Sequence, residues 1–160
     1  MAYLLAKDTV NGAEGKIVVT NADGENIEVA GMKNIRPTAD IQTEDMSVIG
    51  TRIIQKKLKG VAPGGTGNIY YGSDRNLWRD MVLQYINTGN MPLFDIQLTN
   101  KDPATTLGSE VTAYYGCTLT GEIPLSILDS ETAMLNYDFN FVWTRVQRLQ
   151  DFNAPERYGS

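Results

Sequence analysis

A glycine-rich stretch at residues 57–73, KLKGVAPGGTGNIYYGS, has the residue types that bind phosphate groups in nucleotide-binding loops. Gly60 and Gly65 have the spacing of the two glycines of a P-loop. That motif continues with a lysine that reaches the terminal phosphates and a hydroxyl residue that holds magnesium. Here Thr66 and Gly67 follow instead, so the lysine is missing. The stretch does not match a P-loop.

A dinucleotide-binding fingerprint is the other phosphate motif to test in this stretch. If it begins at Gly65, Tyr70 stands where its third glycine is needed. Both motifs lead directly from the loop into a helix, whereas here the run NIYYGS, typical of a strand, comes first. We therefore interpret the glycines as a flexible turn that joins two strands, residues 52–59 and 68–71.

Groups for catalysis or metal binding are scarce in this chain. Histidine is absent, which removes the commonest general base and the commonest metal ligand at neutral pH. The single cysteine, Cys117, lies in the strand-like run VTAYYGCTLTG and is expected to be a buried, small apolar residue. No pair of carboxylates stands out, and no serine has the context of a hydrolase nucleophile. We predict a protein that is not an enzyme and has no metal or cofactor.

Charge is distributed unevenly along the chain. With 14 basic and 19 acidic residues the net charge is −5, which argues against sequence-specific nucleic-acid binding. A basic cluster at residues 52–59 is either a solvated strand face or a face that meets an acidic surface, and acidic residues lie just upstream. Opposite charges on two parts of one chain suit a head-to-tail interface between copies. The candidate interface residues are Asp40, Glu44, Asp45, Arg52, Lys56, Lys57 and Lys59.

The N-terminal half of the chain is predicted to be extended. Residues 15–31 contain two short β-branched runs around an NADG turn, which predicts a β-hairpin. Residues 33–40 are expected to be extended, and residues 41–51 to be a polar connection. The run at residues 52–59 fits a strand better than a short helix.

One helix is predicted, at about residues 74–87. Its apolar residues, from Leu77 to Ile86, form one stripe with the helical period, which predicts a helix packed on a sheet. Ser73 is the expected N-cap, Asp74 complements the helix dipole in the first turn, and Gly89 is the expected C-cap.

Strands are predicted again after the helix, at residues 93–99, 110–120 and 135–144. The last has strict two-residue alternation, with aromatic and apolar residues on one face. From about residue 147 the periodicity is lost, and we expect this end to fray or to dock elsewhere.

The fold class expected from these elements is mainly β. We predict an antiparallel β-barrel or sandwich of about seven or eight strands with one flanking helix. Residues 1–160 are expected to form a single domain, in which residues 40–67 make an extended loop or hairpin region used in assembly. No apolar run approaches the length of a membrane helix, and the N-terminus lacks the basic region of a signal peptide. We therefore expect synthesis in the cytoplasm and no membrane anchor.

The order of these features resembles a known family. An N-terminal hairpin, GKIVVTNADGENIEVAG, precedes KKLKG and GTGNIYY; a helix ending in YINTG and the segment FDIQLTNKDP follow, with LNYDFNFVW near the end. In this order they are similar to the tail tube protein of contractile phage-like particles, the family of the PBSX-type prophage tube. The resemblance covers about residues 10–145.

The resemblance implies a structural role. Such subunits, related in fold to type VI secretion tube proteins, form hexameric rings that stack into a hollow tube inside a contractile sheath, with hairpins lining the lumen as one barrel. It implies sheath, baseplate and tape-measure proteins as partners, within a virion tail or a released bacteriocin-like particle (a tailocin). The alternative is a small β-barrel module that binds a ligand or sugar, for which eight Tyr, four Phe and two Trp supply aromatic side chains.

Overall fold

A computed structural model describes residues 15–72, 76–101, 107–131 and 134–152. Eight strands and one helix lie within these ranges. In chain order they are β1 (Lys16–Thr20), β2 (Asn26–Glu28), β3 (Met32–Met46), β4 (Gln55–Tyr70), α1 (Leu77–Thr88), β5 (Phe94–Lys101), β6 (Ser109–Thr120), β7 (Asn136–Val142) and β8 (Arg145–Gln150). In the described part of the chain, no helix combines the length and apolar character needed to cross a membrane.

All the strands join in one antiparallel sheet. The order is β2-β1-β5-β6-β7-β4-β3, and β8 also pairs with β6. The predicted mainly β class, with about eight strands and one flanking helix, is confirmed. The sheet is not closed into a barrel, because β2 and β3 form its two ends.

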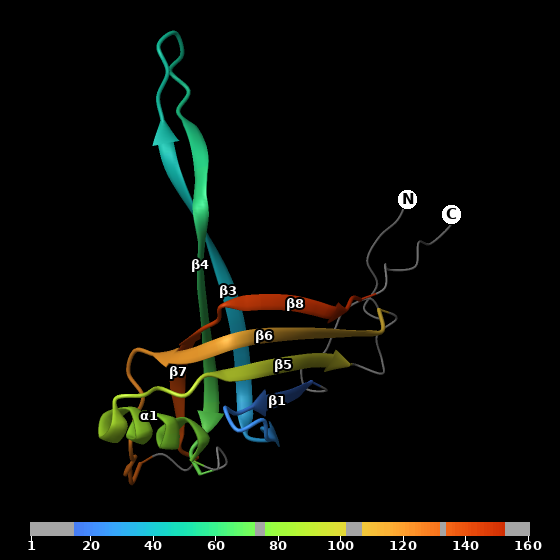
Figure 1. The fold of residues 1–160 in the computed structure, drawn as a ribbon, viewed down its shortest axis with the longest axis vertical. Helices are drawn as coiled ribbons and strands as arrows, with labels where there is room; N and C mark the ends of the chain where they lie inside the picture. The colour runs from blue at the N-terminus through green and yellow to red at the C-terminus, as the bar shows by residue number, and fades with distance from the viewer. Residues whose placement is uncertain (1–14, 73–75, 102–106, 132–133, 153–160) are drawn as a thin grey trace.

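The sheet turns a corner on β6. Residues 111–115 of β6 pair with β8, whereas Thr118–Thr120 pair with β7. Between them lies Gly116, whose positive φ of 63° suits glycine, and Thr144 is bonded to it where the chain passes from β7 to β8. Figure 1 shows the result: β5, β6 and β8 run across the long axis of the molecule, while β3, β4 and β7 run along it. The core fills the angle between the two parts of the sheet.

The core is built around stacked aromatic rings. Trp78 of α1 stacks on Phe139 at 4.7 Å between ring centroids and meets Phe94 edge-on at 5.2 Å. Tyr137, Phe139 and Phe141 alternate inward along β7, which confirms the face predicted from the sequence. The largest fully buried side chains are Trp78, Phe94, Phe139, Phe141, Ile69, Ile96, Val19 and Cys117.

The helix agrees with the prediction in place and in its C-terminal cap. It ends at Thr88, and Gly89 adopts a left-handed conformation and donates its N–H to the carbonyl oxygen of Tyr85 at 2.8 Å. The predicted stripe is only partly covered, since Tyr85 and Ile86 are exposed. The helix begins at Leu77 with Asn76 as its N-cap and Asp80 as the acid of its first turn, so the predictions of Ser73 and Asp74 for these positions are wrong. Ser73 and Asp74 themselves lie outside the described residues.

The strands differ from the predictions in three places. The glycine-rich stretch is not a turn, because β4 runs through it without a break from Gln55 to Tyr70. Residues 41–46, expected in a polar connection, belong to β3. The end of the chain from about residue 147, expected to fray or to dock elsewhere, does not fray: residues 147–150 belong to β8, which docks on β6. The predicted N-terminal hairpin and the strands that form β5, β6 and β7 are confirmed.

Candidate assembly surface

A long two-stranded ribbon projects from the body of the molecule. It is the outer part of the β3–β4 hairpin, residues 38–65, which we call the arm. β7 pairs with β4 only over Thr66–Tyr70, so within the described chain the arm has no further strand beside it. Figure 1 shows it extending along the long axis, well away from the other strands. The region at residues 40–67, predicted to be extended, lies almost wholly in this arm.

The glycines at the base of the arm make room for aromatic rings. Gly65 and Gly67 are on the core-facing side of β4, beside β7, and the ring of Phe141 lies directly against Gly65. A Cβ on Gly67 would approach the Cζ atom of Phe139 to 2.6 Å. The stretch that resembles a phosphate-binding loop is therefore a strand whose glycines let two buried rings touch the backbone.

The opposite face of these strands is polar. Asn68 of β4 donates from Nδ2 to Oδ1 of Asn136 at 3.1 Å and to Oδ1 of Asp138 at 2.8 Å. Because side chains alternate along a strand, this face continues on the arm through Asp40, Gln42 and Glu44 of β3. Gln42 Nε2 donates to Oδ2 of Asp40 at 2.7 Å there. One polar face thus extends from β7 along the arm.

The acidic and basic candidate residues lie opposite one another within the same arm. The register of β3 on β4 pairs Glu44 with Lys57 and Asp45 with Lys56, and the Nζ atom of Lys56 lies 2.6 Å from Oδ1 of Asp45. Their side chains are exposed. Sequence reasoning placed the two charge clusters on separate surfaces, whereas the hairpin brings them together.

The other candidate residues lie elsewhere on the arm. Arg52 is in the segment that joins β3 to β4, Lys59 lies beside a register shift near Gln42, and Asp40 is opposite Ala62. Whether these residues form a subunit interface stays a prediction. The structure places them all on one projecting element, where they are exposed.

Apolar residues on the arm were missed by the sequence reasoning. Ile41 (62% exposed), Leu58 (72%) and Val61 (56%) sit on the ribbon with no core to cover them. Val48, Ile49, Ile53 and Ile54 are exposed at its tip. The sequence does not distinguish these residues from strand residues that pack in a core. Only the position of the arm, outside the core, shows that they are exposed. Such a concentration of exposed apolar side chains is typical of a surface that contacts another molecule.

Trp143 fastens the arm to the body. Its Nε1 donates to the carbonyl oxygens of Thr38, at 3.0 Å, and Gly64, at 3.1 Å, which lie opposite each other at the base of the arm. The ring also packs on Tyr114, with 6.1 Å between centroids. Trp143 directly follows β7, so the last residue of the aromatic alternation holds the point where the arm leaves the sheet.

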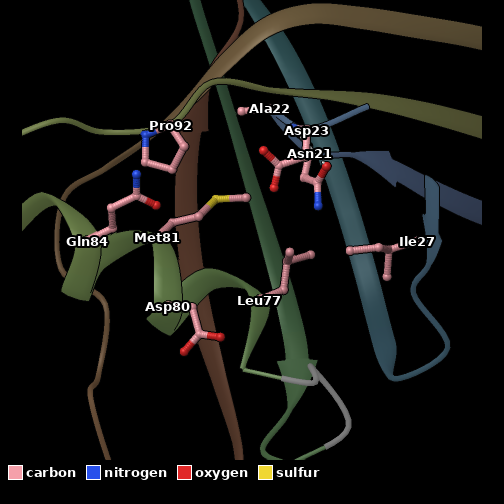
Figure 2. Close-up of a pocket in the computed structure, with 9 residues that line it drawn as sticks. All are labelled: Asn21, Ala22, Asp23, Ile27, Leu77, Asp80, Met81, Gln84 and Pro92. Atoms are coloured by element: carbon pink, nitrogen blue, oxygen red, sulfur yellow. Dashed lines mark hydrogen bonds between the residues drawn. The ribbon is translucent and has the colours of Figure 1, made fainter. Parts of the chain in front are cut away.

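A pocket of about 450 Å³ lies between the β1–β2 turn and α1. Figure 2 shows its walls: Asn21 and Asp23 from the turn, Leu77 and Met81 from the helix, and Pro92 from the segment after it. None of the described lining residues is aromatic, so the pocket lacks the ring faces on which sugars stack. Among the described residues, no group of three or more His, Cys, Asp or Glu is placed to hold a metal ion.

Cys117 has the buried setting that its sequence context predicts. It is fully buried, and its Sγ donates to the carbonyl oxygen of Tyr114 at 3.5 Å. Burial, with a smaller contribution from the nearby Asp95 carboxylate, raises the pKa of the thiol to about 12. The thiol is therefore protonated and unreactive at neutral pH.

Comparison with known sequences gives consistent matches over nearly the whole chain. A family model described as phage tail tube protein matches residues 2–150. The Phage-like element PBSX protein XkdM of Bacillus subtilis (strain 168) is 24% identical over 155 residues, covering 96% of this chain and 95% of that protein. A second protein of that strain, the uncharacterized YqbM, is 25% identical over 158 residues, covering 98% and 97%.

Solved structures share the fold at low sequence identity. The cap structure of the anti-feeding prophage, which terminates its tube, contains a chain with a TM-score of 0.64 and 15% identity, covering 93% of this chain and 95% of that one. A chain in the sheath–tube complex of the PVC extracellular contractile injection system has a TM-score of 0.56 and 12% identity, covering 85% and 88%. The family match includes the arm and the core described above. The chain belongs to the phage tail tube protein family and is a structural tube subunit, not an enzyme.

Proposed function

We propose that copies of this chain form hexameric rings that stack into the hollow inner tube of a contractile phage tail or phage-tail-like particle. The arm is the observation that carries this proposal. Its strands are long, its apolar side chains Ile41, Leu58 and Val61 are exposed, and both its edges lack partners within the described chain. In an isolated protein such an element leaves a row of backbone N–H and C=O groups unpaired, and exposed strand edges of this kind pair with other chains. Pairing with arms of neighbouring copies satisfies its backbone and covers its apolar surface.

The polar face of β3, β4 and β7 is the surface proposed to line the lumen. The hydrophobic core lies on the other side of these strands, so this face is turned away from the body of the subunit. Asn68, Asn136 and Asp138 form a hydrogen-bonded polar surface there, and Asp40 and Glu44 add negative charge along the arm. A hydrated, partly acidic surface suits a channel through which cargo moves without binding to the channel wall.

The charged residues of the arm are proposed to contribute to contacts between copies. Glu44 and Asp45 lie on β3, and Lys56 and Lys57 lie on β4, so the two strands of each arm carry opposite charge. A ring of identical copies places β3 of one arm next to β4 of another and brings these opposite charges together. Asp40, Arg52 and Lys59 extend the same surface.

Sheath, baseplate and tape-measure proteins are the proposed partners of the finished tube. Among the fold neighbours are chains from a sheath–tube complex and from a baseplate, which supports assembly with tail components of these kinds. The subunit is proposed to be made in the bacterial cytoplasm and to end in a virion tail or a released phage-tail-like particle.

Negative-stain electron microscopy of the purified protein tests the proposal, together with sedimentation velocity over a wide range of concentration. Rings with six-fold symmetry, or hollow tubes, are the expected result. A monomer that remains monodisperse at the highest concentration, and after addition of preformed tube fragments from the same particle, would contradict self-assembly.

Charge variants test the contribution of the arm. Lys56→Glu is expected to weaken assembly, but it also places a second acid opposite Asp45 within the arm. The swapped variant Asp45→Lys with Lys56→Glu restores the internal pair and serves as the control. The swap restores opposite charges both within one arm and between β3 of one copy and β4 of the next, so urea unfolding of the unassembled subunit separates the two cases. If Lys56→Glu weakens assembly but leaves the unfolding free energy of the subunit unchanged, the charge acts between copies. If the loss of assembly is matched by a loss of unfolding free energy, the pair acts within the arm.

A further inference from the structure

The corner on β6 contains a β-bulge. The register of β6 on β5 shifts between Phe94 and Ile96, so two residues of β6, Tyr115 and Gly116, lie opposite the single residue Asp95. A bulge of this kind bends its strand and increases the local twist. It lies where β6 changes its partner on the other side from β8 to β7. The bulge is therefore the place at which the two parts of the sheet take different directions.

Asp95 binds the backbone of this bulge. The extra residue of a bulge is left out of the strand ladder, so its N–H needs another acceptor. Oδ1 of Asp95, a half-buried residue, accepts the N–H of Gly116 at 3.0 Å. A carboxylate makes stronger hydrogen bonds than a neutral oxygen does. The side chain of Asp95 thus ties β5 to the corner of β6.

The link between β7 and β8 binds the same bulge. Oγ1 of Thr144 donates to the carbonyl oxygen of Gly116 at 2.9 Å, and the N–H of Thr144 donates to the carbonyl oxygen of Tyr115 at 3.0 Å. The preceding residue, Trp143, bonds through Nε1 to both strands of the arm at its base. Hydrogen bonds therefore connect β5, the corner of β6 and the base of the arm in one series.

The position of the arm depends strongly on the angle at this corner. From Thr38 to Met46 the outer part of β3 spans about 26 Å, at about 3.3 Å per residue. A rotation of about 11° at the base moves Met46 by about 5 Å, which is the spacing of neighbouring strands in a sheet. Apolar contacts in the core are non-directional, whereas a hydrogen bond weakens steeply when its angle changes. The hydrogen bonds at the corner are thus suited to fix this angle.

We propose that Asp95 is a positioning residue, which together with Gly116 and Thr144 forms an elbow that fixes the angle between the two parts of the sheet and so the direction of the arm. The consequence for assembly rests on the proposed function. An arm held in one direction before assembly does not lose further conformational freedom when it meets another copy. The elbow therefore lowers the concentration at which the subunit assembles.

Distances between two spin labels in the unassembled subunit test the elbow directly. The labels are attached through Thr43→Cys on the arm and Lys101→Cys at the end of β5, both exposed positions, while the buried Cys117 does not react. Because β5 runs across the long axis and the arm runs along it, this distance changes with the angle (Figure 1). Asp95→Ala removes the acceptor and is expected to shift or widen the distance distribution by about 5 Å, the displacement that a rotation of about 11° gives.

Two variants serve as controls. Asp95→Asn keeps a side-chain oxygen that accepts the N–H of Gly116 and is expected to retain the wild-type distances. Asp129→Ala removes a bond of the same kind elsewhere, since Oδ1 of Asp129 accepts the N–H of Glu131 at 3.0 Å, and it should leave the distances unchanged. A wild-type distribution in Asp95→Ala, or an equal change in Asp129→Ala, would overturn the proposal.

Amide hydrogen exchange at Gly116 tests the elbow in the wild-type subunit, even if Asp95→Ala fails to fold. This N–H is expected to exchange at least about a hundredfold more slowly than an unstructured amide, because it is bonded to the carboxylate. Exchange at the rate of an unstructured amide would show that the bond is not maintained and would overturn the proposal.

The critical concentration for assembly tests the consequence of the elbow. It is expected to rise at least about tenfold in Asp95→Ala and to stay near the wild-type value in Asp95→Asn. A changed distance with an unchanged critical concentration would overturn the link to assembly. If the wild-type chain forms no rings or tubes, the proposed function fails, while the distances still test the elbow. If tubes form and Asp95→Ala keeps the wild-type distances, only the present inference fails.

Discussion

The substitution Gly67→Ala tests the role of the glycine-rich strand. A Cβ at residue 67 would lie 2.6 Å from the Cζ and 2.7 Å from the Cε1 atom of Phe139, and 3.3 Å from the carbonyl oxygen of Asn34. Phe139 is 0% exposed and is stacked on Trp78, so its ring has no free space into which it can move. The added methyl group must therefore displace the core.

The expected cost follows from two opposing effects. Overpacking of a core by one methyl group costs about 1–3 kcal/mol. Replacing glycine restricts the unfolded chain and offsets this by about 0.4–1 kcal/mol. The net loss of unfolding free energy is then about 1–2 kcal/mol, which corresponds to a Tm lower by about 2–8 °C in a chain of this size.

Thermal and urea unfolding of the unassembled subunit, followed by circular dichroism, measure this loss. Gly64→Ala is the matched control on the opposite face of the same strand, where the nearest side-chain atom is Oγ1 of Thr38 at 3.2 Å and can rotate away. Its unfolding free energy is expected to change by less than about 0.5 kcal/mol. Shortening the ring with Phe139→Leu should reduce the cost of Gly67→Ala in a double-mutant cycle. A Gly67→Ala variant as stable as the wild type, or equal losses at both glycines, would refute the reasoning.

Three further predictions concern the thiol, the base of the arm and its charges. Cys117 is expected to resist thiol reagents at pH 8 in the folded subunit and to react once the chain is unfolded. Because its pKa is raised from 9.0 to about 12, the native state keeps a proton that the unfolded chain loses, so this thiol lowers the unfolding free energy as pH rises from about 9 to 12. Trp143→Phe keeps an aromatic ring but loses the Nε1 donor. The lost hydrogen bonding should lower the unfolding free energy by about 0.5–1.5 kcal/mol and speed amide exchange at the base of the arm; unchanged exchange would contradict its anchoring role. Lys56→Gln should change the stability of the subunit by less than about 1 kcal/mol, since the ion pair with Asp45 is exposed, and a larger loss in urea unfolding would show a stronger pair than its exposure allows.

Elements with a strong local signal were predictable from the sequence. The alternation along residues 135–144 identified the buried face of β7, and the helical stripe with Gly89 identified α1 and its C-terminal end. The order of quoted segments also indicated the tail tube family, which the family match confirms. These signals are local because side-chain alternation and capping depend on neighbours in the chain.

The glycine-rich strand shows where local reasoning fails. Glycines between residues 60 and 67 have weak strand propensity, so a turn was the natural prediction. In the structure, the rings of Phe139 and Phe141 need the space that side chains at Gly65 and Gly67 would fill. Those partners lie more than 70 residues away in the chain, so no local pattern could reveal the reason for the glycines.

The sequence by itself determined the mainly β class, the two faces of its strands, the single helix and the absence of a catalytic histidine. The tertiary structure alone decided that the acidic and basic clusters face each other across one hairpin, and that this hairpin projects beyond the core. The physical reason is that charge pairing and exposure depend on the register of β3 on β4 and on where β7 ends. Register and strand length are set by packing across the whole sheet. Apolar residues such as Ile41 and Val61 are therefore predicted as core residues until their position on the arm is known.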